Sequence, residues 1–412
     1  MKTCTSTIAM SSCFRHTLFA GLLLAALPTW AAEWAAQPSV TLREEYNDNI
    51  LLTTLPHSAV WGTILTPSLT LSRSSEVSQM SASARLNFNR YAGESGLDRN
   101  DQYFALSSNY KTERDIWAGD ASYTRDSTLT SELNQTGIVQ ARTQRNLLTL
   151  TPSWTRVLSE RNSLKLGYEY DQASYDGSSV GLINYSNQSA QASWLYQLSE
   201  SDLVNMTASY SRFQTADGNH KADTAGIQGG LTHSFSETLK GSVLLGLNRT
   251  HSIINSPAQV LVIGPFILHL PAQTVSSTNV VPVLNATLEK KFETTTVNVS
   301  ASRALNPTGN GVLVETDQLG LGVSHSFTEN FSGSVNGSAY RSRYIGNAAV
   351  ASANSRYYEL ALNLNWRMNE RWVLDSGYRY ARVEYQASSL VPVSNMVYAS
   401  VRYDWPKISA SR

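Results

Sequence analysis

Beyond residue 31 the chain contains no cysteine, because its two cysteines, Cys4 and Cys13, both lie near the start. The main part of the chain therefore has no disulfide framework, no thiolate metal site and no cysteine nucleophile. An excess of one charge is also missing, since Lys plus Arg and Asp plus Glu number 32 each and charged residues make up only 16% of the sequence. Without a basic face, we expect no nucleic-acid partner.

Long apolar runs are lacking too, with one short exception near the start. Residues 18–27 are apolar, follow Arg15 and His16, and precede the small residues Thr29 and Ala31. A helix needs about 20 residues to span a bilayer, so this run is too short for an anchor. We predict a signal peptide over residues 1–31 that is removed, with Met10 as an alternative start.

Several segments of the chain instead show apolar and polar residues at alternate positions. Apolar and aromatic residues occupy every second position over residues 80–88, 164–170, 358–366 and 397–405, with mostly polar residues between them. This period of two indicates strands with one apolar and one polar face. A soluble β-sandwich would show similar alternation, so alternation alone does not distinguish a sandwich from a membrane barrel. The residues at the strand ends provide the distinction.

A short motif recurs where the strands end: an apolar residue, a small polar residue and a glutamate. It occurs as Leu158-Ser159-Glu160, Leu198-Ser199-Glu200, Phe235-Ser236-Glu237, Phe327-Thr328-Glu329 and Met368-Asn369-Glu370, with a shorter Phe292-Glu293 and looser copies around Glu76 and Glu113. The mean spacing of about 42 residues suits one hairpin of two ten-residue strands. Eight such turns join nine hairpins and alternate with longer polar connections, as in the periplasmic and extracellular ends of an outer-membrane barrel.

Large aromatic residues gather near the same turns and termini. We predict that they form a girdle at one membrane interface. A soluble sandwich has no reason to line its bulkiest aromatics up at one end, where water would penalise the patch. The residues are Trp154, Trp194, Phe235, Phe292, Phe327, Trp366, Trp372 and Trp405.

We therefore predict an all-β fold, an antiparallel transmembrane β-barrel of about 18 strands with short periplasmic turns and longer extracellular loops. It would span residues 39–405, after a short periplasmic lead-in (32–38) and before a periplasmic tail (406–412). The expected location is the outer membrane of a Gram-negative bacterium, with outer-membrane lipids and lipopolysaccharide as neighbours. The closing strand, with Tyr403 and Trp405 on one face, resembles the signal that barrel-assembly machinery recognises, although the tail after Trp405 departs from that pattern.

Parity along the strands predicts which charged residues face the lumen. Both signs are mixed, so an open lumen would be a weakly selective aqueous path; alternatively the charges pair across the wall and merely solvate the interior. The lumen residues predicted in this way are Arg85, Lys165, Glu169, Glu359, Arg367, Asp375, Arg379, Arg402 and Asp404.

One connection breaks the repeat. Residues 259–270 contain two apolar arms around Gly264-Pro265, which suggests a small hairpin too short to cross a membrane. Folded inward it would be a constriction or cap, and standing outward it would be an adhesive or oligomer-forming patch. We favour the inward role, formed by Val260, Leu261, Val262, Ile263, Gly264, Pro265, Phe266, Ile267 and Leu268.

The stretch Arg43-Glu44-Glu45-Tyr46-Asn47-Asp48-Asn49-Ile50 is predicted to form the upper part of the first strand and the start of the first outer loop. It lacks the turn glycine and distal glutamate of a calcium loop, so we interpret it as a polar strand end facing water or lipopolysaccharide and predict no metal. The run Tyr46-Asn47-Asp48-Asn49-Ile50, together with Thr66-Pro67-Ser68-Leu69, Pro152-Ser153-Trp154 and Leu158-Ser159-Glu160, resembles the β-barrel porin 2 family of bacterial outer-membrane proteins. The resemblance implies a barrel channel, in some relatives associated with polysaccharide production, with no catalytic residues to carry over.

The residues give little indication of a catalytic site. A barrel hydrolase would need a serine, a histidine and an orienting acid at matched height. His233 and His325 instead occupy the same slot, two residues before a turn aromatic, which favours an interfacial role. We expect no enzyme and no cofactor. Two functions stay open: a passive or gated channel for small hydrophilic solutes or saccharides, and a surface structural or polysaccharide-export component with a loop-closed lumen. The solute and the oligomeric state stay open as well.

Overall fold

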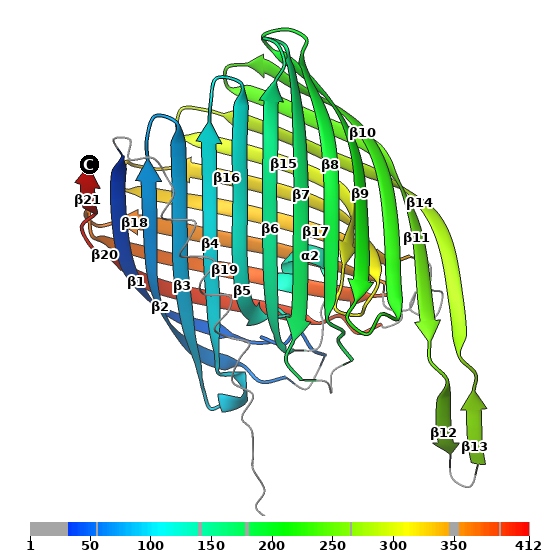
Figure 1. Ribbon diagram of the computed structural model, residues 1–412. Coiled ribbons are helices and arrows are strands. Elements are labelled where there is room, and N and C mark those ends of the chain that lie inside the picture. The colour runs from blue at the N-terminus through cyan, green and yellow to red at the C-terminus, as the bar shows by residue number, and fades with distance from the viewer. Residues whose placement is uncertain are drawn as a thin grey trace, which may run out of the picture.

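The alternating segments form strands, and the strands join into one antiparallel barrel (Figure 1). The computed structural model describes residues 32–54, 57–138, 142–177, 181–263, 266–345, 354–386 and 389–411. The strands are β1 (Glu33–Asn47), β2 (Val60–Ser74), β3 (Ser78–Ala92), β4 (Arg99–Lys111), β5 (Asp115–Ser127), β6 (Gln144–Val157), β7 (Asn162–Tyr175), β8 (Tyr185–Gln197), β9 (Asp202–Thr215), β10 (His220–Ser236), β11 (Leu239–Ser256), β12 (Gln259–Ile263), β13 (Phe266–Leu270), β14 (Gln273–Lys291), β15 (Thr295–Pro307), β16 (Leu313–Ser326), β17 (Phe331–Tyr344), β18 (Ser355–Arg367), β19 (Trp372–Tyr385), β20 (Val393–Asp404) and β21 (Ile408–Ser411). Two short helices, η1 (Ser95–Leu97) and α2 (Ser131–Thr136), lie in connections. Among the described residues, no helix has the length and apolar character to cross a membrane.

The wall closes between its first and last strands. Each barrel strand pairs with the next, and β1 pairs with β20 from Ser39↔Asp404 to Asn47↔Met396. Eighteen strands, β1–β11 and β14–β20, make up the barrel, which confirms the predicted fold. The remaining strands are the separate hairpin β12–β13 and β21, which extends the sheet beside β1.

Alternation gives the wall two different faces. On β18 the outward side chains run Tyr358, Leu360, Leu362, Leu364 and Trp366, each 36–48% exposed. Exposing such a row to water would forfeit about 25 cal/mol for every Å² of apolar surface, so the outer face suits a lipid surrounding. The polar residues between them point into the lumen.

The recurring motif lies in the short turns. The eight connections from β2 to β3, β4 to β5, β6 to β7, β8 to β9, β10 to β11, β14 to β15, β16 to β17 and β18 to β19 hold the eight glutamates of the repeat. The small polar residue shapes the turn by accepting a backbone hydrogen bond. The Phe331 N–H donates to Thr328 Oγ1 at 3.0 Å, and the Trp372 N–H donates to Asn369 Oδ1 at 3.0 Å.

The predicted girdle residues lie at this short-turn end. Seven of them are 40–61% exposed. The eighth, Trp154, packs against Trp117 with the ring centroids 5.8 Å apart, and its Nε1–H donates to Asp115 Oδ1 at 3.0 Å.

The ends of the chain are more ordered than we expected. The lead-in and tail were placed outside the barrel, yet Glu33–Ala36 of β1 pair with β21, from Glu33↔Ser411 to Ala36↔Ile408. The Trp405 N–H also donates to the Pro38 carbonyl at 3.1 Å. Pro406 has no N–H to continue the ladder, which accounts for the break between β20 and β21. Residues 1–31, the predicted signal peptide, lie outside the described residues.

Candidate functional site

The lumen holds two adjoining cavities along the wall made by β1–β4 and β18–β20. One, of about 390 Å³, lies toward the long loops and is closed on one side by residues 127–133. The other, of about 650 Å³, lies toward the short turns. Arg43, Ile64, Asn87 and Tyr398 line both, so the long-loop cavity and the short-turn cavity adjoin one another along the wall, and we call the two together the path.

Elsewhere the long-loop end of the lumen is filled by chain. Residues 128–138, between β5 and β6, fold into the barrel and carry α2 (Figure 1); we call this segment the inward loop. The β15–β16 connection joins it, because the Gly309 N–H donates to Glu132 Oε1 of α2 at 2.9 Å. The Gly309 carbonyl also accepts a hydrogen bond from the Ile183 N–H of the β7–β8 connection at 2.7 Å.

Glu132 of α2 anchors the inward loop. Its side chain is fully buried, and Oε1 accepts hydrogen bonds from the Tyr175 hydroxyl and from the Gly309 N–H at 2.9 Å. Arg145 Nη1 lies 3.9 Å from the same oxygen. Burial raises the pKa of the Glu132 carboxyl, although the Tyr175 and Gly309 hydrogen bonds and the Arg145 charge oppose the shift. One carboxyl thus joins the loop to β6, to β7 and to the β15–β16 connection.

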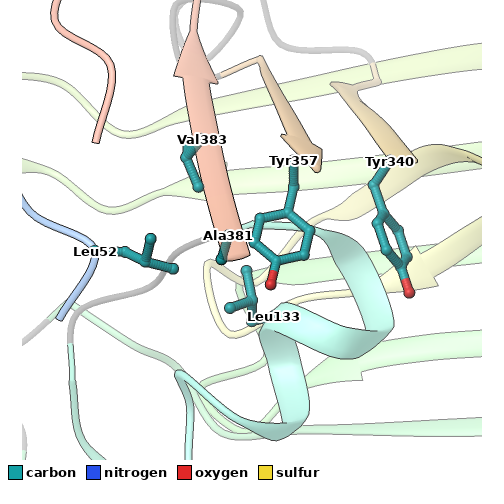
Figure 2. Close-up of a cluster of buried hydrophobic side chains, with 6 residues drawn as sticks. All are labelled: Leu52, Leu133, Tyr340, Tyr357, Ala381 and Val383. Atoms are coloured by element: carbon teal, nitrogen blue, oxygen red, sulfur yellow. The ribbon is translucent and has the colours of Figure 1, made fainter. Parts of the chain in front are cut away.

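Leu133 adds an apolar anchor, which Figure 2 shows. Its side chain is 1% exposed and packs in a cluster with Leu52 of the β1–β2 connection and with Tyr340, Tyr357, Ala381 and Val383 of β17, β18 and β19. The helix then ends at Gly137, whose φ of 66° is left-handed. A Cβ there would lie 2.5 Å from the Tyr340 Cβ, so only glycine allows α2 to press this closely against β17.

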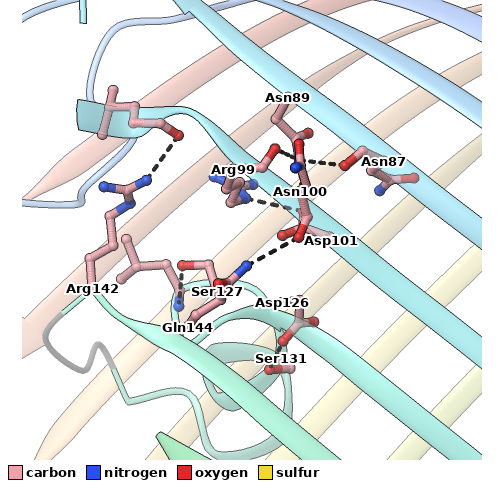
Figure 3. A network of polar contacts seen from close by, with 12 residues as sticks. Asn87, Asn89, Arg99, Asn100, Asp101, Asp126, Ser127, Ser131, Arg142 and Gln144 are labelled. Carbon is pink, nitrogen blue, oxygen red and sulfur yellow. Dashed lines mark hydrogen bonds and ion pairs between the residues drawn. The ribbon is translucent and has the colours of Figure 1, made fainter. Parts of the chain in front are cut away.

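A polar network stiffens the side of the path nearest β3 and β4 (Figure 3). The Asp101 carboxylate receives Asn89 Nδ2–H at 2.8 Å and pairs with Arg99 Nε at 3.1 Å. Arg142 donates to the carbonyls of Gly96 and Leu97, at 2.6 and 2.8 Å. The connection between α2 and β6 is thereby tied to η1, which holds the inward loop against two neighbouring connections.

Seven of the nine predicted lumen residues line the path. Glu359 and Arg379 line the long-loop cavity, and Arg85, Arg367, Asp375, Arg402 and Asp404 line the short-turn cavity. Lys165 and Glu169 lie on β7 with the parity opposite to the outward-facing Leu166 and Tyr168, and they line neither of these cavities.

The lumen charges are partly paired. Arg379 bonds Glu359 at 2.8 Å and Arg402 bonds Asp404 at 3.2 Å. Arg85 instead lies over the Tyr103 ring, 4.2 Å from its centroid. Among the described residues, neither Arg85 nor Arg367 has a carboxylate within ion-pair distance, so both leave positive charge in the short-turn cavity.

Some residues of the stretch 43–50 line the lumen, and others lie at the junction of β1 and β20, which we call the seam. Arg43 and Glu45 line the long-loop cavity and pair at 2.8 Å. Asp48 accepts hydrogen bonds from the Asn395 N–H and Nδ2–H, both at 2.7 Å, and Asn49 Nδ2–H donates to the Val393 carbonyl at 2.9 Å. The amides and carboxylate therefore join β1 to β20. In the part of the chain that the structure describes, no three His, Cys, Asp or Glu side chains are grouped to hold a metal.

The hairpin β12–β13 stands beyond the ends of β11 and β14, clear of the lumen (Figure 1). This placement differs from the constriction or cap that we expected of residues 260–268, of which Gly264 and Pro265 lie outside the described residues. A hairpin whose arms continue β11 and β14 follows the direction of those strands, whereas the inward loop is drawn in by Glu132 and Leu133. Sequence reasoning missed those two residues, because residues 126–144 read as one more polar connection.

His233 and His325 repeat their surroundings as well as their positions. Each ring meets the turn aromatic edge-on, with centroids 4.5 Å apart for His233 and Phe235 and 4.7 Å for His325 and Phe327. Nδ1 of His233 lies 2.6 Å from Asp202 Oδ1, whereas Nδ1 of His325 lies 2.7 Å from Thr295 Oγ1. The shared feature is the ring packing beside a turn.

No family model matches the chain, and no curated protein matches its sequence. Solved structures do resemble it. Acinetobacter baumannii OccAB4 has a TM-score of 0.46 and 10% identity, with 92% of this chain and 99% of that chain covered. The outer membrane protein OpdK of Pseudomonas aeruginosa has a TM-score of 0.44 and 11% identity, with 90% and 99% covered. At such identities the similarity concerns the fold alone.

Proposed function

We propose that the protein is an outer-membrane channel through which small hydrophilic solutes diffuse along the wall of β1–β4 and β18–β20. The observation that carries this proposal is the polar path of two adjoining cavities inside a closed wall with an apolar outer face. At its long-loop end the path is bounded by the inward loop through Leu129, Thr130 and Leu133, where polar and apolar side chains both line it. Membership of the β-barrel porin 2 family and the absence of catalysis stay predictions from the sequence.

The lining favours anions weakly. Seven arginines and five carboxylates line the two cavities. Among the described residues, Arg142 in the long-loop cavity and Arg85 and Arg367 in the short-turn cavity have no carboxylate within ion-pair distance. A surplus of one sign along a water-filled path raises the local concentration of the opposite ion. We infer a mild preference for small anions rather than strict selection.

Planar-bilayer recordings of the purified, heat-modifiable protein test the proposal. We expect ohmic conductance steps. In a KCl gradient, the reversal potential should have the sign that indicates a preference for chloride over potassium. The double variant Arg85→Gln and Arg367→Gln should shift this potential toward zero, while Arg249→Gln, an exposed residue on the outer side of β11, should leave it unchanged. A silent membrane from folded protein would contradict the channel, and cation preference would contradict the role of the arginines.

A second function is favoured by one observation. The inward loop and the β15–β16 connection occupy much of the lumen at the long-loop end, which suits a surface or export component whose lumen opens only with a partner. Silence of the wild-type protein, together with conductance after the inward loop is released, would favour this alternative.

A further inference from the structure

A cluster of arginines lies on the outer face of the barrel at its long-loop end. On β18 the outward row continues from Tyr358 to Arg356, two residues or about 7 Å further along the strand. Cross-strand partners share a face, and the register places the neighbouring arginines at matching positions. The set, which we call the rim cluster, is Arg303, Arg341, Arg343, Arg356 and Arg382.

Carboxylates neutralise only part of the rim cluster. Glu315 and Asp317 pair with Arg303 and Arg343. Glu384 bonds Arg382 at 2.6 Å and reaches Arg356 at 4.0 Å. Five guanidinium groups thus face three carboxylates. Among the described residues Arg341 forms no ion pair, although Asp317 is its cross-strand partner on β16.

Arg341 and Arg356 are the informative pair, because they are direct partners across β17 and β18. Like charges directly opposite each other destabilise a sheet. Both side chains are exposed, and both line a hollow of about 380 Å³ that also contacts Arg343 and Glu384. An anion seated in this hollow would relieve the repulsion and accept bidentate hydrogen bonds from either guanidinium.

The position of the hollow identifies the source of the anion. Arg341 and Arg356 lie on the same face of the wall as the apolar row of Tyr358, Leu360 and Leu362, and Arg356 continues that row toward the long loops. Ser342 and Ser355, of the opposite parity, also line the hollow, which therefore lies between the two faces. A lipid in the outer leaflet places its phosphate beside arginines and its acyl chains along those apolar side chains, whereas free phosphate would use only the arginines. We propose that the rim cluster binds the phosphate of an outer-leaflet glycolipid, with Arg341 and Arg356 as its principal contacts. The site is separate from the proposed solute path.

The test is native mass spectrometry of the full barrel in detergent, titrated with diphosphoryl lipid A and, in parallel, with the same lipid lacking its phosphates. Each arginine near a charged surface contributes about a five-fold effect, so the double variant Arg341→Gln and Arg356→Gln should bind diphosphoryl lipid A about 25-fold more weakly. Arg249→Gln is the matched control, since that exposed arginine on β11 pairs with Ala225 and Val280 across its strands. It should bind as the wild type does.

Further results distinguish the phosphate of a lipid from free phosphate as the bound anion. Wild-type protein should prefer the phosphorylated lipid, and inorganic phosphate at millimolar concentration should compete poorly. Equal binding of both lipids, complete displacement by inorganic phosphate, or unchanged binding by the double variant would each overturn the proposal. Should the double variant fail to show the heat-modifiable band of a folded barrel, Arg341→Lys replaces it. That variant keeps the charge but loses the bidentate geometry, so it should bind more weakly than wild type, and equal binding would again count against the site.

Discussion

Replacing Glu132 by alanine should release the inward loop. The change leaves the Tyr175 hydroxyl and the Gly309 N–H without their buried acceptor, at about 1–3 kcal/mol each. Arg145, 2% exposed, also loses a carboxylate, although 3.9 Å is a long ion pair and adds little. Removing a carboxyl whose burial is unfavourable offsets part of this loss. A net weakening of about 2–4 kcal/mol lowers the equilibrium constant for the docked loop roughly 30- to 1000-fold.

Single-channel recording is the suitable assay, because the docked loop narrows the path. Glu132→Ala should give a larger mean conductance with frequent transitions. Glu132→Gln keeps an oxygen for Tyr175 and Gly309 and should behave much like the wild type, which separates hydrogen bonding from charge. Glu200→Ala, on an exposed short turn, controls for the loss of a carboxylate. Conductance steps of Glu132→Ala that match the wild type in size and noise, from folded protein, would refute the anchoring role.

Three other outcomes are expected. Leu133→Ala removes a 1% exposed side chain from its cluster and should weaken docking by about 2–5 kcal/mol, giving the same noisy conductance. Asp48→Ala removes the two hydrogen bonds to Asn395 between the ends of β1 and β20, at a cost of about 1–3 kcal/mol. The variant should therefore convert from the folded to the unfolded form on gels at a lower temperature than the wild type. Glu94→Ala, on an exposed loop, should leave that temperature unchanged. Because burial raises the Glu132 pKa, docking is strongest below the carboxyl's ordinary pKa and weakens as pH rises through the raised value. Conductance should therefore fall on acidification, a response that Glu132→Gln should lack.

The wall was predictable from sequence because its causes are local. A period of two sets the face of Leu360 and Leu362 whatever surrounds them, and Ser159 or Thr328 shapes its own turn through a backbone bond two or three residues away. The count of eighteen strands follows from counting such turns. Closure then requires that β1 meet β20, and β21 continues the same edge over Glu33–Ala36.

The lumen was less predictable because its contacts are distant in sequence. Leu133 meets Tyr340, Tyr357 and Val383 more than 200 residues away along the chain, and Glu132 meets Gly309 at a separation of 177 residues. No local period marks such contacts. The apolar hairpin at residues 259–270 carried the stronger local signal for a constriction, yet it follows β11 and β14 beyond the barrel end. A leucine and a glutamate followed by Gly137 in a polar loop were the available clue.

Selectivity should depend on the arginines that lack a carboxylate partner, because pairing decides how much of each charge a solute meets. In the long-loop cavity Glu45, Asp101 and Glu359 each bond an arginine, so among the described residues Arg142 is the lining arginine there without a carboxylate partner. In the short-turn cavity the described residues leave Arg85 and Arg367 without such a partner, and Asp375 bonds Asn365 rather than an arginine. The inward loop therefore controls whether a solute enters, and these arginines bias which sign passes. The two properties depend on different residues, so changing Glu132 should alter conductance while leaving the reversal potential near its wild-type value.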